Sequence, residues 1–151
     1  MQGIVCMKSN ILIVEDHELT RFGLKTAFES CDFVEEIYEA ESAEVGIDIV
    51  DKKQIDLVIM DLGLPGIDGI EATQRIKQYN KDVKIVILTS HNDSQEVLNS
   101  LKAGANAYCS KEINECCGIS AYSVIISIFF RISDFENHLS IFSALFNFLI
   151  H

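Results

Sequence analysis

The stretch that most constrains the fold is residues 54–69, QIDLVIMDLGLPGIDG. It contains an uninterrupted apolar run, Leu57–Met60, which is typical of a strand covered on both faces in a parallel α/β sheet. The run stops at Asp61. A carboxylate directly after a buried strand lies at the strand's carboxyl end, where open α/β sheets bind their ligands. The stretch therefore predicts a buried strand that delivers one carboxylate to a candidate site.

The residues after this carboxylate predict a turn and a new helix. Leu64-Pro65-Gly66, which contains the only proline of the chain, has the composition of a tight turn. Asp68 is placed to cap the following helix, and Glu71, three residues later, completes the pattern of a capping box. Strand, acidic loop and helix thus follow one another directly.

The same alternation of strand and helix extends over the first 111 residues. Apolar runs predict further buried strands, and one segment of alternating polarity predicts an edge strand. The predicted strands are Ile11–Val14, Glu36–Ala40, Leu57–Met60, Val83–Leu88 and Ala107–Ser110. Such alternation predicts the α/β class: a doubly wound parallel sheet in three layers, with helices on both faces.

Helical periodicity predicts which side chains face the core. Ser42 is expected to cap the second helix, and Gly104 is expected just after the end of the fourth. The apolar positions expected to face the sheet are Phe22, Leu24, Ala27 and Phe28 in a helix over 19–30, Ala43, Gly46, Ile47 and Val50 in the second helix, Ala72, Ile76 and Tyr79 in a helix over 70–79, and Val97, Leu98 and Leu101 in the fourth.

Polar side chains stand at the carboxyl ends of four predicted strands. They are Glu15 and Asp16 after the first strand, Asp61 after the third, Thr89 after the fourth and Lys111 after the fifth. A parallel sheet brings these ends to one edge. Three carboxylates there repel one another by roughly 4 kcal/mol per close pair at an effective dielectric constant near 20. Because one lysine cannot neutralise them, the set predicts a divalent cation, and Mg²⁺ suits hard oxygen ligands.

A carboxylate at such a site is able to act as a nucleophile toward phosphorus and form an aspartyl phosphate. Phosphoryl transfer depends on positioning and on neutralising oxygen charge more than on acid–base catalysis. Asp61, on the central strand, is the candidate attacking group.

The ordered set is E-D after the first strand, D-x-x-L-P after the third, T-S after the fourth and K after the fifth. It resembles the receiver domains of bacterial two-component response regulators, and the match extends over about residues 9–113. The resemblance implies a flavodoxin-like fold with strand order 2-1-3-4-5 and a receiver domain at residues 9–115. The segments Arg21–Leu24 and Gly69–Ile76 look most like the NarL/FixJ class, which carries a LuxR-type helix-turn-helix.

The resemblance also implies roles for the acidic residues. Asp61 would take a phosphoryl group from a histidine of a sensor kinase or phosphotransfer protein. Mg²⁺ would be held by Asp16, Asp61 and the backbone carbonyl of Gly63, with Glu15 acting directly or through water.

Three further residues receive roles from the resemblance. Lys111 would pair with Asp61 and then with a phosphoryl oxygen, and the Thr89 hydroxyl would donate to another. Tyr108 would rotate into the space that Thr89 vacates, as a switch. Lys111 is followed by Glu112, where many receivers have a proline with a cis bond, so that bond is not expected.

Composition limits compartment and partners. A net charge of −11 argues against direct nucleic-acid binding by this chain. Five cysteines without C-x-x-C spacing predict free thiols in a reducing cytoplasm, and Cys116-Cys117 with His138 fits no zinc pattern. The first ten residues lack the features of a signal peptide, and translation could start at Met1 or at Met7.

The resemblance stops after Asn114, and residues 116–151 form an atypical hydrophobic tail with no recognisable output domain. The tail holds six of the nine phenylalanines but only three charged residues. No apolar run reaches the roughly 18 residues that a transmembrane helix needs. A frameshift or truncation is the favoured explanation, and a genuine structural tail is the alternative.

The predicted function is a phosphorylatable switch rather than a turnover enzyme. One alternative is a pseudo-receiver, or a non-functional truncated regulator, that only binds a protein partner. Another is a magnesium phosphohydrolase, which Gly63 disfavours because similar enzymes carry a second aspartate there. The oligomeric state stays open, with a homodimer as one alternative.

Overall fold

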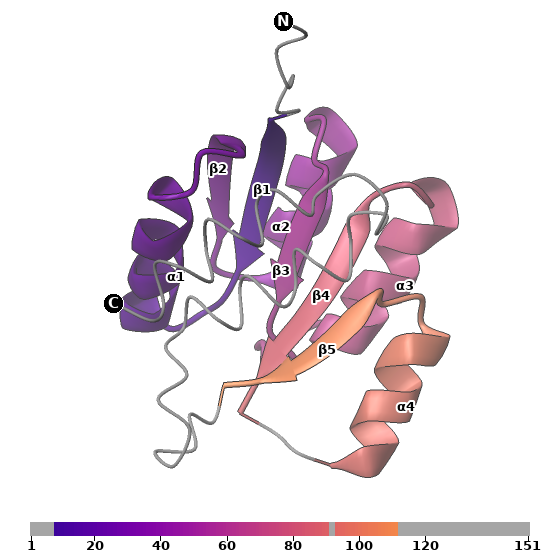
Figure 1. Cartoon of the computed structure of the whole chain (residues 1–151). Helices are drawn as coiled ribbons and strands as arrows, with labels where there is room; N and C mark the ends of the chain where they lie inside the picture. The colour runs from indigo at the N-terminus through magenta and orange to yellow at the C-terminus, as the bar shows by residue number, and fades with distance from the viewer. Residues whose placement is uncertain (1–7, 91–92, 112–151) are drawn as a thin grey trace, which may run out of the picture.

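The computed structural model describes residues 8–90 and 93–111 (Figure 1). Within them, a five-stranded parallel sheet has the order β2-β1-β3-β4-β5, which confirms the predicted flavodoxin-like topology. The elements are β1 (Ser9–Val14), α1 (Glu18–Glu29), β2 (Val34–Ala40), α2 (Ala43–Lys52), β3 (Leu57–Met60), α3 (Gly69–Tyr79), β4 (Lys84–Thr89), α4 (Ser94–Lys102) and β5 (Ala107–Ser110).

The central strands are buried on both faces, as their apolar sequences predict. All four residues of β3 are buried, and β1 and β4 are buried over most of their length. Ile59 of β3 lies between Ile13 of β1 and Val86 of β4 in the parallel register. The edge strand β2 has only one buried residue, Ala40, which agrees with its alternating sequence.

Two apolar cores lie on opposite faces of the sheet. Side chains such as Leu12, Val58 and Ile85 pack with α2 and α3 on one face. Neighbouring positions such as Ile11 and Ile59 pack with α1 on the other face, because successive side chains of a strand point to opposite sides. Figure 1 shows α2 and α3 behind the sheet and α1 beside β2.

The predicted helix caps are present. The Ser42 hydroxyl accepts a hydrogen bond from the Val45 amide at 3.3 Å, and the Asp68 carboxylate accepts one from the Glu71 amide at 2.8 Å. The side chain of Glu71 pairs with Arg75 at 2.5 Å instead of completing the predicted capping box with Asp68. Gly104 follows α4 with a φ of +105° and Gly66 turns with a φ of +80°, a conformation that glycine adopts without strain.

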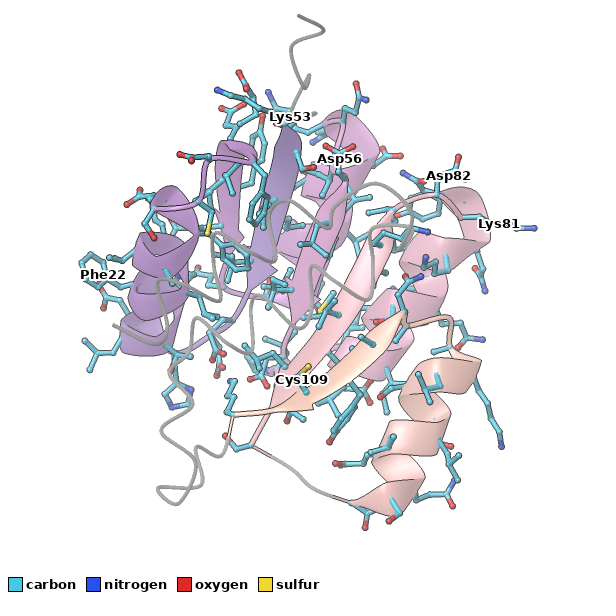
Figure 2. The ribbon with its side chains drawn as sticks, viewed as in Figure 1. Phe22, Lys53, Asp56, Lys81, Asp82 and Cys109 are labelled. Carbon is cyan, nitrogen blue, oxygen red and sulfur yellow. The ribbon has the colours of Figure 1, made fainter. Side chains whose placement is uncertain are left out.

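Several side chains predicted to face the sheet are exposed instead. Phe22 is 66% exposed and points outward from α1 (Figure 2), because Leu24, Ala27 and Phe28 lie on the opposite side of the helix. Tyr79 is half-exposed because it is the last residue of α3, where the helix ends.

The prediction for α4 was wrong for two of its three residues, since Leu98 and Leu101 are exposed, whereas Val97 is half-buried. The buried residue of α4 is Ser100, whose hydroxyl donates to the Glu96 carbonyl at 2.7 Å. A serine satisfied within its own helix can face a core, but it carries no apolar signal.

Several predictions lie outside the described residues: the tail at 116–151, the choice of start codon, and Cys6, Cys116, Cys117 and Glu112. Among the described residues, Cys31 and Cys109 are not joined in a disulfide. In the part of the chain that the structure describes, no helix combines the length and apolarity needed to cross a bilayer.

Two glycines provide a matched test of the packing. A Cβ at Gly69 would lie 2.1 Å from the Asp61 carbonyl oxygen, whereas a Cβ at Gly23, inside α1, meets nothing within 4 Å. Gly69→Ala is expected to lower the free energy of unfolding by about 1–3 kcal/mol through overpacking against backbone. Gly23→Ala is expected to raise it by about 0.5–1 kcal/mol. Urea denaturation of both variants measures these changes, and equal effects would contradict the close approach at Gly69.

Candidate functional site

The sheet register brings the ends of β1 and β3 together. Val14 pairs with Met60, and the Asp61 amide donates to the Val14 carbonyl at 3.0 Å. The residues that follow, Glu15 and Asp61, therefore leave the sheet side by side. The parallel topology thus joins two acidic residues that lie far apart in the sequence.

The ends of β4 and β5 complete the same edge. Thr89 is buried at the end of β4, and its carbonyl accepts a hydrogen bond from the Lys111 amide at 2.7 Å. The Lys111 ammonium donates to Glu15 Oε2 at 2.5 Å and lies 3.3 Å from Asp61 Oδ1. Glu15, Asp61, Thr89 and Lys111 therefore meet at one edge of the sheet.

The Glu15 carboxylate is the most deeply buried charge of this edge, with 1% of the residue exposed. Its Oε1 accepts from the His17 amide at 3.1 Å, while its Oε2 accepts from Lys111. The Lys111 ammonium is thus closer to Glu15 than to Asp61, whereas the resemblance predicted Asp61 as its partner. A buried carboxylate needs such partners. Removing the partner of a buried ion pair typically lowers the free energy of unfolding by about 3–5 kcal/mol.

Asp16 and His17 lie at the outer side of the site. The Asp16 side chain is partly exposed, and its Oδ1 is 3.4 Å from His17 Nδ1. Donor atoms of Glu15, Asp16 and His17 all lie within 4.8 Å of one another. His17 was not among the residues predicted for the site, although it directly follows the acidic pair in the sequence.

Asp61 has its two carboxylate oxygens in different surroundings. Oδ1 faces Lys111, and Oδ2 lies 3.8 Å from where a Cβ of Gly63 would be. The turn after Gly63 is held from α2, since Glu44 Oε1 accepts from the Ile67 amide at 3.3 Å. Backbone hydrogen bonds at Glu44 and Ile67 lower the pKa of the Glu44 carboxyl group, so it stays ionised as an acceptor.

The chemistry of this edge suits a magnesium ion. Glu15, Asp16 and Asp61 offer hard oxygen atoms, and the Lys111 ammonium neutralises only part of their charge. Mg²⁺ prefers one or two carboxylates and retains several waters. The exposed Gly63, next to Asp61, leaves the approach to Oδ2 free of a side chain.

Tyr108 lies on β5, away from these charged groups. It is half-buried and packs against the core that α2 and α3 share. Burial raises the pKa of its hydroxyl, and the carboxylates of Glu96 and Asp93 raise it further. Tyr108 therefore stands beside the first part of α4, where Glu96 lies.

Comparisons with known proteins agree with this geometry. The model of the response regulator receiver domain family matches residues 11–120. The transcriptional regulatory protein DegU of Brevibacillus brevis is 34% identical over 118 residues, which is 78% of this chain and 50% of DegU. A LuxR-family response regulator from Aurantimonas sp. SI85-9A1 superposes with a TM-score of 0.68 at 32% identity, over 80% of this chain and 86% of that one.

The isolated receiver domain of RcsB from Salmonella enterica serovar Typhimurium also superposes, with a TM-score of 0.64 at 26% identity, over 69% of this chain and 78% of that one. The chain spans about half the length of the curated relatives it matches. The family match includes every residue of the sheet edge from Glu15 to Lys111. With that match and this fold, the chain belongs to the response regulator receiver domain family.

Proposed function

We propose that this chain is the phosphoacceptor switch of a two-component system, and that Asp61 accepts a phosphoryl group from a phosphohistidine of a sensor kinase or phosphotransfer protein. The observation that carries the proposal is the Lys111 ammonium, which bridges Glu15 Oε2 at 2.5 Å and Asp61 Oδ1 at 3.3 Å. The similar receiver domain of RcsB was solved in the presence of the phosphomimetic BeF3⁻, which supports the same chemistry here.

The geometry suggests how the transfer proceeds. Asp61 Oδ2 attacks phosphorus, so that an O–P bond forms as the P–N bond of the phosphohistidine breaks and the imidazole takes a proton from solvent. Lys111 already faces Oδ1 and donates to a phosphoryl oxygen. The hydroxyl of Thr89, buried at the end of the neighbouring strand, donates to another. These groups stabilise charge on the equatorial oxygens, which is the main requirement of phosphoryl transfer.

Magnesium belongs to the same proposal. Asp16, Asp61 and the backbone carbonyl of Gly63 would hold the ion, which neutralises charge on the phosphoryl oxygens when bound. Glu15 is already engaged by Lys111 and by the His17 amide. Glu15 therefore contributes to magnesium binding through its negative charge or through a bridging water, and not as a direct ligand.

Phosphorylation would be read out through Tyr108. A phosphoryl group that engages Thr89 shifts the population toward a state in which Tyr108 packs further inward. The half-buried position of Tyr108 beside Glu96 supports this role, because a modest rotation would change the surface of α4.

Two other functions are less well supported. A rapid phosphohydrolase of this type needs an acid–base group two residues after the nucleophile, but this chain has Gly63 at that position. A pseudo-receiver would need no acidic set, whereas Lys111 joins Glu15 and Asp61 here. We further propose that the chain does not itself bind DNA, because its charge of −11 repels phosphates.

The phosphoacceptor is tested by Asp61→Asn. Incubation with acetyl phosphate and magnesium should add one phosphoryl group to the wild-type chain and none to this variant, since an amide is not a competent nucleophile. Mass spectrometry under mild conditions measures the adduct. Asp56→Asn is the matched control, because Asp56 precedes β3 and lies at the opposite end of the sheet (Figure 2). Equal labelling of Asp61→Asn and wild type would refute the assignment.

The metal requirement is tested by Asp16→Asn. This change removes a carboxylate ligand, so magnesium affinity should fall by at least about tenfold. Glu15→Gln should weaken binding less, because Glu15 already has two protein donors. Calorimetric titration of the folded variants measures both. Unchanged affinity in both variants would contradict the proposed ligand set.

The neutralising role of Lys111 is tested by Lys111→Met. Removing the ammonium leaves the buried Glu15 carboxylate unpaired, which should lower the free energy of unfolding by about 3 kcal/mol or more. Added magnesium should restore part of this stability by supplying positive charge. Lys52→Met is the control, since Lys52 pairs with Asp48 on the surface of α2 and should cost less than about 1 kcal/mol. Similar losses in both variants would argue against a buried pair at Glu15.

A further inference from the structure

We propose that Arg21 is a positioning residue of the magnesium site: its guanidinium holds the peptide between Glu15 and Asp16 and so sets where the two carboxylates point. This inference rests on the proposed function only in that the site binds magnesium. Arg21 lies in the first turn of α1, after the acidic pair, and its amide donates to the His17 carbonyl at 2.9 Å.

The guanidinium joins two different groups. Arg21 Nη1 donates to the Glu15 carbonyl oxygen at 2.7 Å, and Arg21 Nε lies 3.6 Å from Glu39 Oε1. Glu39 belongs to β2 and pairs with Ile13 in the sheet register. Arg21 is thus a bridge from helix α1 to both the end of β1 and the neighbouring strand.

The backbone at Glu15 is therefore held by two hydrogen bonds, one at its amide and one at its carbonyl. The Glu15 amide donates to the Ala40 carbonyl at 3.0 Å, which continues the pairing of β1 with β2. The Glu15 carbonyl belongs to the next peptide and lies past the last residue of β1. In the part of the chain that the structure describes, Arg21 donates to this carbonyl and so restrains the peptide that leads into Asp16.

Arginine suits this position better than other donors. Its planar group presents several N–H donors in a fixed geometry, so it can engage a carbonyl and a carboxylate together. The Arg21 side chain is 18% exposed, and shielding from water strengthens such contacts. Glu39 also accepts from Lys25 at 2.7 Å, through Oε2 rather than Oε1. Lys25 therefore shares Glu39, and its ammonium contacts Glu39 rather than Glu15.

The consequence for metal binding follows from geometry. Mg²⁺ demands near-octahedral oxygen ligands, and groups that orient metal ligands typically change affinity by about 10–100-fold when removed. Without Arg21, the peptide between Glu15 and Asp16 gains rotational freedom. Asp16 would then spend only part of its time in the orientation that the ion requires.

The test compares magnesium affinity in Arg21→Met and Lys25→Met, measured by calorimetry on the full chain with MgCl2. Arg21→Met is expected to bind about tenfold or more weakly. Lys25→Met loses an ion pair with the same Glu39 and is expected to stay within about twofold of wild type, since exposed pairs contribute little. Urea denaturation of both variants shows whether stability changes in parallel.

Affinity in Arg21→Met within twofold of wild type, or an equal loss in Lys25→Met, would overturn the proposal. If Arg21→Met does not fold, Arg21→Lys decides, because a single ammonium keeps the charge but not the planar bridge. Wild-type affinity in Arg21→Lys would show that bridging is not needed. Failure of the proposed function is separately visible, because it appears as absent Asp61 labelling while this readout measures magnesium binding alone.

Discussion

The contact on which the site depends is the pairing of the buried Glu15 carboxylate with the Lys111 ammonium, 96 residues away in the sequence. The Glu15 carboxylate is 1% exposed. Removing the partner of such a buried charge lowers the free energy of unfolding by about 3–5 kcal/mol. Lys111 reaches it because β5 ends beside β4, and the Lys111 amide is held by the Thr89 carbonyl. The order of strands in the sheet therefore decides whether the charges at this edge are tolerable.

Lys111 does not neutralise all of the negative charge at this edge of the sheet. Its ammonium is shared between Glu15 and Asp61, whereas Asp16 lies beside His17. The remaining negative charge favours the divalent cation that we propose for this edge. A site that was fully neutralised by its own side chains would be more stable and less responsive. Under the proposed function, the same residues connect the stability of the fold to magnesium binding and phosphorylation.

Backbone geometry holds these charges in place. Gly69 lets α3 begin directly against the Asp61 carbonyl, and Gly66 turns the loop with a φ of +80°. On the other side of the site, Arg21 and the Ala40 carbonyl hold the backbone at Glu15. The carboxylates therefore leave rigid elements rather than free loops, as preorganised ligand sites require.

Much of the fold and the candidate site could be predicted from local patterns. The apolar run at Leu57–Met60 predicted a buried strand, the alternating sequence of β2 predicted an edge, and residues at strand ends predicted an acidic edge with one lysine. These signals are local because burial on two faces, capping and chain turning each act within a few residues. The predicted buried faces of α1 and α4 were partly wrong, because Phe22 and Leu98 are apolar but exposed, whereas Ser100 is polar but buried.

The sequence by itself determined the order of the elements and which residues stand at their ends, because strand and helix periodicity is a local property of the chain. Only the tertiary structure decided that Lys111 lies nearer to Glu15 than to Asp61, and that Arg21 joins the Glu15 carbonyl to Glu39. Those choices depend on distances between strands and helices that pack against one another. No pattern within a single segment contains them, because an arginine on a helix surface has the same local sequence whether its partner is water or a carbonyl.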